Sequence, residues 1–111
     1  MKDDAIYLGH ILECIKRIEE HATQGRDAFL SSHTLQDATL RNLQTMSEAT
    51  QRLSDVTKAT QPQIPWRQIG AFRNIVVHNY LGLDLYQIWV TIEKDIPPLK
   101  LATQEMLAAQ P

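Results

Sequence analysis

The sequence predicts an all-α fold, an antiparallel bundle of four or five helices within a single domain, residues 1–111. Apolar residues recur every three or four positions along most of the chain, which is the period of an amphipathic helix. Aromatic residues make up only 6% of the chain and glycines number four, a composition that favours helices over a β-sandwich. Short polar or proline-containing segments separate the periodic stretches, so consecutive helices are expected to pack antiparallel.

The first helix is predicted from Asp4 to Ala22, with charged residues opposite an apolar stripe. The stripe consists of Leu8, Ile11, Leu12, Ile15, Ile18 and Ala22. Gly25 breaks this periodicity, and a short helical turn is expected from Arg26 to Leu30. The lone cysteine, Cys14, lies beside the stripe and is therefore expected to be a packed, unreactive thiol.

A second long helix is predicted from Thr34 to about Lys58. Asp37 follows Thr34 at the third position, which resembles a capping box with Asp in place of Glu. The apolar stripe of this helix consists of Leu35, Leu43, Met46, Leu53 and Val56. Pro62 and Pro65 end it, because proline lacks the amide hydrogen that the interior of a helix needs.

Three shorter helices are predicted after the prolines, at residues 65–82, 84–96 and 99–109. Their apolar residues are Ile69, Phe72, Val76 and Tyr80 in the first of them, and Leu85, Ile88, Trp89 and Ile92 in the second. Asp84 is expected to cap the second of these helices with its side chain. The Pro97-Pro98 pair ends that helix and opens the last one, since proline is tolerated in a first helical turn.

The composition and the motifs exclude several classes of protein. One cysteine can form neither a disulfide within the chain nor a multi-cysteine zinc site. The longest apolar stretch falls short of the roughly 20 residues of a membrane-spanning helix, and the acidic start is unlike a signal peptide. The chain has no glycine-rich phosphate loop, HExxH motif or GxSxG motif. We therefore expect a soluble cytoplasmic protein that uses no cofactor.

The net charge of −2 conceals an uneven distribution of charged residues. No carboxylate occurs from residue 56 to residue 83, and Lys58, Arg67 and Arg73 give this segment a charge of +3. The rest of the chain therefore carries −5. The average charge argues against a protein coated with basic residues, but a positive segment without carboxylates is typical of a site for an anionic ligand.

The polar segment from Arg73 to Tyr80 is the strongest candidate for chemistry. It places Arg73, Asn74, His78 and Tyr80 in a helix whose other residues are mostly apolar. Arginine pairs with phosphate and imidazole changes its charge near neutral pH, a combination suited to phosphodiester chemistry. The alternative is structural: Arg73 and His78 cap the helix end or pair with carboxylates of another helix, and Tyr80 is a half-buried packing residue.

Helical geometry constrains this candidate site. Arg73 and His78 point about 140° apart on an ideal helix, whereas Asn74 and His78 are about 40° apart, so Asn74 can orient the imidazole. Arg73 and Tyr80, seven residues apart, share a face of such a helix. Arg73 and His78 can converge if the helix ends near His78, or if two copies of the chain meet across a two-fold axis.

The segment Arg73–Tyr80 resembles the RX4HXY motif of the HepT-like proteins, a branch of the HEPN superfamily of helical ribonucleases. The resemblance covers nearly the whole chain. The other similar segments are Asp37–Leu43, Ser47–Ala49, Ile64–Trp66, Ile88–Trp89 and Asp95–Pro97. Ser47 is a departure, since many relatives have glycine before the Glu-Ala pair, and this difference affects helix packing more than the site.

The resemblance implies an all-helical homodimer in which Arg73 and His78 line a cleft at the interface. It implies a metal-independent RNA endonuclease that is the toxin of a type VII toxin–antitoxin pair. In such pairs the antitoxin is an MntA-type nucleotidyltransferase, which transfers AMP from ATP onto the motif tyrosine, here Tyr80. Lys58 and Arg67 are candidate contacts to the RNA backbone, because they are the other cations of the positive segment.

Two other functions fit the same residues. A non-catalytic HEPN-type protein would use the cleft to bind nucleotide or to dock a nucleotidyltransferase. A helical adaptor would use its polar helix end only for capping and ion pairs. The intact motif favours the nuclease, because a binding-only protein need not keep both Arg73 and His78. Growth arrest on expression, relieved by changing either residue, separates the nuclease from the adaptor.

Overall fold

The computed structural model describes residues 2–111 and the side chains from Asp3 onward. The prediction of an all-α fold is confirmed, since these residues form seven α-helices, one 3₁₀ turn and no strand. The helices are α1 (Lys2–Ala22), α2 (Arg26–Ser31), α3 (His33–Gln51), α4 (Asp55–Ala59), α5 (Trp66–His78), α6 (Leu85–Lys94) and α7 (Ile96–Ala108), and the 3₁₀ turn is η1 (Tyr80–Gly82). None of the helices in this part of the chain is long and apolar enough to cross a membrane.

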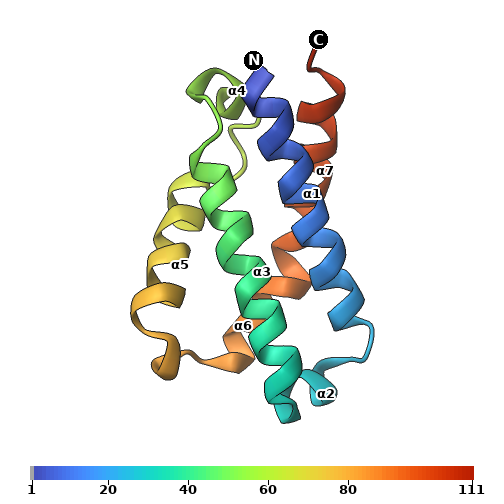
Figure 1. Ribbon diagram of the computed structural model, residues 1–111, viewed down its shortest axis with the longest axis vertical. Helices are drawn as coiled ribbons and strands as arrows, with labels where there is room; N and C mark the ends of the chain where they lie inside the picture. The colour runs from blue at the N-terminus through green and yellow to red at the C-terminus, as the bar shows by residue number, and fades with distance from the viewer. Residues whose placement is uncertain (1) are drawn as a thin grey trace.

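The long helices α1 and α3 form the centre of the bundle. α1 packs against both α3 and α7, and α6 packs against α7 and α2. Both chain ends lie near α4 at one end of the molecule, with α2 at the other end (Figure 1). α5 packs on α3, on the side away from α1 (Figure 1). The helix that carries the RX4HXY residues is therefore held mainly by one neighbour.

One continuous apolar core joins these helices. It includes Leu8, Ile11, Ile15 and Ile18 of α1, Leu40, Leu43 and Met46 of α3, and Leu99, Ala102 and Met106 of α7. Towards the α2 end of the core, the rings of Phe29 and Trp89 pack with their centroids 5.6 Å apart. Cys14 is buried with its Sγ 3.3 Å from Thr45 Oγ1, which confirms the prediction of a packed thiol.

A buried carboxylate, Asp4, ties the start of α1 to the start of α4. Asp4 accepts hydrogen bonds from the Ser54 amide at 2.9 Å, the Ser54 hydroxyl at 2.6 Å and the Thr57 hydroxyl at 2.6 Å. The Ser54 hydroxyl accepts in turn from the Thr57 amide and so caps α4. Burial opposes ionisation of Asp4, but the hydrogen bonds from Ser54 and Thr57 outweigh it and lower the pKa of Asp4.

Replacing Asp4 with alanine is expected to lower the free energy of unfolding by roughly 2–3 kcal/mol, because a charged acceptor of several hydrogen bonds is lost. Because the pKa of Asp4 is lowered in the folded protein, the ionised carboxylate stabilises the fold at pH values above the ordinary aspartate pKa of 3.8. The difference from wild type should therefore be full at pH 7 and shrink as the pH falls below that value. Denaturant titrations at pH 7 and pH 3 measure it. The control is Asp3→Ala, which removes the neighbouring exposed carboxylate. An equal loss of unfolding free energy in Asp3→Ala would contradict the prediction.

The predicted long helix from Thr34 to Lys58 is wrong at its C-terminal end, because α3 ends at Gln51 and a separate α4 follows. The break lies at Ser54, whose backbone is extended and whose side chain caps the next helix. Leu53 is buried as expected. Val56 is 76% exposed, so its assignment to the apolar stripe is also wrong. The chain changes direction between Leu53 and Val56, and helical spacing no longer relates them.

The two capping predictions have different outcomes. Ser32, not Thr34, caps α3, since its hydroxyl accepts from the Leu35 amide at 3.2 Å. The Asp84 cap is confirmed, because its carboxylate accepts from two amides in the first turn of α6. Ser32 has the extended backbone of an N-cap residue, whereas Thr34 is already helical.

Two further predicted helix boundaries need correction. The helix expected to reach Gly82 ends at His78, because Asn79 leaves the helical conformation (φ −134°, ψ 41°) and η1 follows. The last helix begins at Ile96 rather than Leu99. Its two prolines lie in the first turn, where their missing amide hydrogens cost no helical hydrogen bond.

α5 is fixed in place by contacts at its N-terminal end. The Trp66 indole donates to the carbonyls of Lys58 at 3.2 Å and Gln61 at 3.1 Å, which joins the start of α5 to the preceding segment. Gly70 faces the end of α3, since a Cβ atom there would lie 2.7 Å from the side-chain nitrogen of the exposed Gln51. These contacts hold the start of α5, the helix that presents Arg73 and His78.

Candidate functional site

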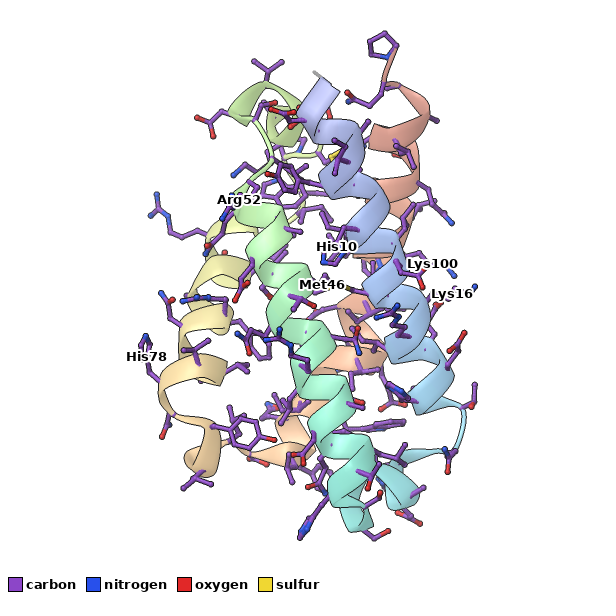
Figure 2. All side chains as sticks on the ribbon, viewed as in Figure 1. His10, Lys16, Met46, Arg52, His78 and Lys100 are labelled. Atoms are coloured by element: carbon purple, nitrogen blue, oxygen red, sulfur yellow. The ribbon has the colours of Figure 1, made fainter. Side chains whose placement is uncertain are left out.

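Arg73 and His78 both lie on α5 but point in different directions. His78, the last residue of α5, is exposed and points away from the bundle (Figure 2). Arg73 reaches towards α3, and 31% of its side chain is exposed. Their five-residue spacing produces this divergence. The helix does end at His78, yet the two side chains do not meet within one chain.

The Arg73 guanidinium is held by a carboxylate of α3. Its Nε lies 3.3 Å from Glu48 Oε1 and donates to it. Gln44 donates to the same Glu48 oxygen at 3.0 Å. This bond from Gln44, followed by the hydrogen bond and charge of Arg73, lowers the pKa of Glu48 although burial opposes ionisation. Glu48 is thus charged at neutral pH, and Arg73 pairs with a carboxylate of another helix, as the structural alternative predicted for it.

Asn74 supports Arg73 in this structure. Its side-chain oxygen accepts a hydrogen bond from Arg73 NH1 at 3.2 Å. Among the described residues, no hydrogen bond joins Asn74 to His78. The orientation of the His78 imidazole by Asn74 therefore stays a prediction. Two acceptors, Glu48 and Asn74, define the plane of the guanidinium.

Tyr80 does not share a face with Arg73, and that prediction is wrong because Tyr80 begins η1 instead of continuing α5. Its hydroxyl donates a hydrogen bond to Asp37 of α3. The side chain is still 42% exposed. The hydrogen bond to Asp37, together with partial burial and the negative charge of Asp37, raises the pKa of Tyr80.

The three cations of the positive segment do not form one cluster. Lys58 belongs to α4, at the end of the bundle opposite the C-terminal end of α5 (Figure 1), and its Nζ lies 4.0 Å from Asp55. Arg67 is exposed in the first turn of α5. Eleven residues separate Arg67 from His78, which is about 16 Å along a helix axis. Contacts of Lys58 and Arg67 with RNA stay predictions.

Two carboxylates of the site, Glu48 and Asp37, escaped the sequence-based search. Both lie on α3 and contact motif residues that follow them by 25 and 43 positions. A signal was available in the spacing of polar residues along that helix. Asp37, Arg41, Gln44 and Glu48 recur at four- and three-residue intervals, so they form a polar stripe on one face. The part of the chain that the structure describes contains no group of three or more side chains suited to hold a metal ion.

Together, a helical bundle and an arginine–histidine pair on one outer helix define a protein of the HEPN class. Comparison with protein families identifies the branch. The HepT-like ribonuclease family matches residues 11–106, which is most of the chain. The protein therefore belongs to the HepT-like family of ribonucleases.

Individual relatives agree with this assignment. A Thermococcus cleftensis protein named as a probable ribonuclease HepT is 36% identical over 95 residues, covering 85% of this chain and 86% of its own length. A protein of Caldanaerobacter subterraneus subsp. tengcongensis named as a candidate RNase is 33% identical, covering 96% of both chains.

A Methanocaldococcus jannaschii protein, whose name combines a gamma-glutamylcyclotransferase with a candidate RNase, is 40% identical over 100 residues. That alignment covers 89% of this chain but only 45% of the relative, so the chain spans less than half of that larger protein. Among solved structures, none gives a significant match.

Proposed function

We propose that the protein is an RNA endonuclease that needs no metal ion. The observation that carries the proposal is the placement of the RX4HXY residues on α5 and η1, with His78 exposed and Arg73 held by Glu48. A guanidinium held in place and an accessible imidazole suit a reaction at a phosphodiester when both reach the same phosphate. The relatives named as ribonucleases support the same activity.

The proposed reaction uses two side chains. Neutral His78 takes the proton from a ribose 2′-hydroxyl, and the oxygen attacks the adjacent phosphorus. The imidazolium, or the partner's His78, then gives a proton to the leaving 5′-oxygen. Arg73 binds the phosphate and stabilises the negative charge that develops in the transition state. Proton transfer of this kind accelerates a reaction by roughly 10²–10⁴-fold.

A homodimer would complete this site. Within one chain Arg73 and His78 diverge, but a two-fold axis beside α5 would bring Arg73 of one protomer towards the partner's His78. The surface around the site supports such a contact, because α5 packs mainly on α3 and large apolar side chains beside the motif are exposed. Ile75 is 50% exposed and Leu81 is 98% exposed. Large exposed apolar side chains are typical of an interface where they gather on one surface.

The biological role proposed is that of a cytoplasmic toxin. Its antitoxin is an MntA-type nucleotidyltransferase, which uses ATP to attach AMP to Tyr80. Tyr80 is open to solvent in part, since 42% of the residue is exposed. Each AMP adds a negative phosphodiester and a bulky nucleoside two residues from His78. Repulsion of the RNA backbone and simple occlusion would then stop cleavage.

The nuclease proposal predicts that purified protein cleaves RNA in excess EDTA. His78 and Arg73 supply the proton transfer and the charge stabilisation, so chelation of divalent ions should leave the rate within about twofold. Gel analysis of RNA fragments measures the rate. A double variant, Arg73→Ala with His78→Ala, is purified in parallel and should be inactive. RNA left intact by the wild type would favour the non-catalytic alternative, and equal cleavage by the double variant would reveal a contaminating nuclease.

A further inference from the structure

The contact between Asp37 and Tyr80 distinguishes this tyrosine from the other tyrosines of the chain. The Tyr80 hydroxyl donates to the carboxylate of Asp37. Tyr86 is 52% exposed, but its ring packs under the guanidinium of Arg26 and its hydroxyl has no hydrogen-bond partner among the described residues. Tyr7 is half-buried against the core. Accessibility alone would therefore not single out Tyr80, whereas a carboxylate acceptor does.

We propose that Asp37 positions the Tyr80 hydroxyl as the nucleophile for nucleotidyl transfer and accepts its proton during the reaction. This inference rests on the proposed modification of Tyr80 by a nucleotidyltransferase antitoxin. Asp37 is exposed on α3, and Tyr80 lies in η1, so both groups remain accessible to an enzyme that approaches from solvent. A carboxylate within hydrogen-bond reach of a hydroxyl is the usual arrangement of an activated nucleophile.

The atoms of the transfer balance with ATP as the second reactant. The Tyr80 oxygen attacks the α-phosphorus, the new oxygen–phosphorus bond forms, and the bond between the α- and β-phosphates breaks. Pyrophosphate leaves, and the phenolic proton passes to Asp37 and then to water. The hydrogen bond to Asp37 raises the pKa of Tyr80, so the phenol stays protonated until the attack begins. Removal of that proton within the reaction is therefore needed, and Asp37 already contacts it.

The same contact would be lost when Tyr80 is modified. An AMP ester of Tyr80 has no hydroxyl proton, and its phosphodiester is negative. The hydrogen bond from η1 to Asp37 is then impossible, and two negative charges face each other at that place. Transfer thus removes the hydrogen bond that ties η1 to α3, directly after His78.

The test is the single-turnover rate of AMP transfer, measured by intact mass with saturating MntA-type nucleotidyltransferase, Mg²⁺ and ATP. Wild type is compared with Asp37→Asn, which keeps an oxygen acceptor for the Tyr80 hydroxyl but cannot take its proton. At pH 7 we expect a loss of at least tenfold in the variant. Asp55→Asn changes an exposed carboxylate elsewhere and should react like wild type. Tyr80→Phe should gain no AMP.

The pH dependence separates proton transfer from a structural effect. In Asp37→Asn the phenol must ionise by itself, and its ionised fraction rises about tenfold per pH unit below its ordinary pKa near 10. The ratio of the wild-type rate to the variant rate should therefore fall from pH 7 to pH 9. Any effect of pH on the antitoxin itself is the same for both toxins and cancels in this ratio. Equal rates, or a ratio that stays constant with pH, would overturn the proposed role of Asp37 and leave the modification of Tyr80 untouched. No mass gain in wild type would remove the proposed modification itself.

Discussion

Replacing His78 with alanine is expected to lower the rate of RNA cleavage by roughly 10²–10⁴-fold, the contribution of a general acid–base group. The imidazole is the only group of the motif that can both accept and donate a proton near neutral pH. His78 is exposed at the end of α5, so its removal leaves the core unchanged. Cleavage of a defined RNA in EDTA, followed with time on a denaturing gel, measures the effect.

The histidine prediction has a matched control in His33. His33 is also exposed and also lies at a helix end, the first turn of α3. His33→Ala should cleave RNA at the wild-type rate, and both variants should unfold within about 0.5 kcal/mol of wild type because exposed substitutions of this kind change stability little. Cleavage by His78→Ala at the wild-type rate would refute the assignment of His78.

The regular parts of the fold could be predicted because burial follows helical periodicity. In α1 the predicted stripe contains Leu8, Ile11 and Ile15, and all three are buried. The prediction of helix boundaries failed where a hydrogen bond to a residue distant in the sequence ends one helix and starts the next. Ser54 starts a new helix through its own side chain and the Asp4 carboxylate, a contact across 50 residues. A stripe read along the sequence carries no information about such a partner.

The charge of the candidate site could likewise be predicted only in part from the sequence. The segment from 56 to 83 has no carboxylate of its own, but α3 places Glu48 against Arg73 and Asp37 against Tyr80. The site is therefore not a purely positive surface. One of its cations is partly neutralised and oriented, while His78 remains open to solvent. A count of charges along the segment does not include the carboxylates that α3 brings against it. The motif could therefore be predicted from the sequence, whereas the contacts of Glu48 and Asp37 with it could not.

Replacing Arg73 with lysine is expected to lower RNA cleavage by roughly 10²–10³-fold, although the charge is kept. The guanidinium gives Nε to Glu48 and NH1 to Asn74. Among the described residues its third nitrogen, NH2, has no hydrogen-bond partner, so this edge is available to a phosphate. A lysine ammonium is one compact charge, and pairing with Glu48 would withdraw it from the phosphate. The cleavage assay in EDTA measures the loss.

A stability measurement separates this effect from damage to the fold. The Arg73–Glu48 pair is partly exposed, so its loss should cost no more than about 1 kcal/mol of unfolding free energy. Arg17→Lys changes an exposed arginine that pairs with Glu13 on α1, and it should leave cleavage unchanged. If Arg73→Lys cleaved RNA within twofold of wild type, a point charge would suffice at this position. The positive charge at position 73 would then be what cleavage needs, and the planar, oriented geometry of the guanidinium would contribute nothing to it.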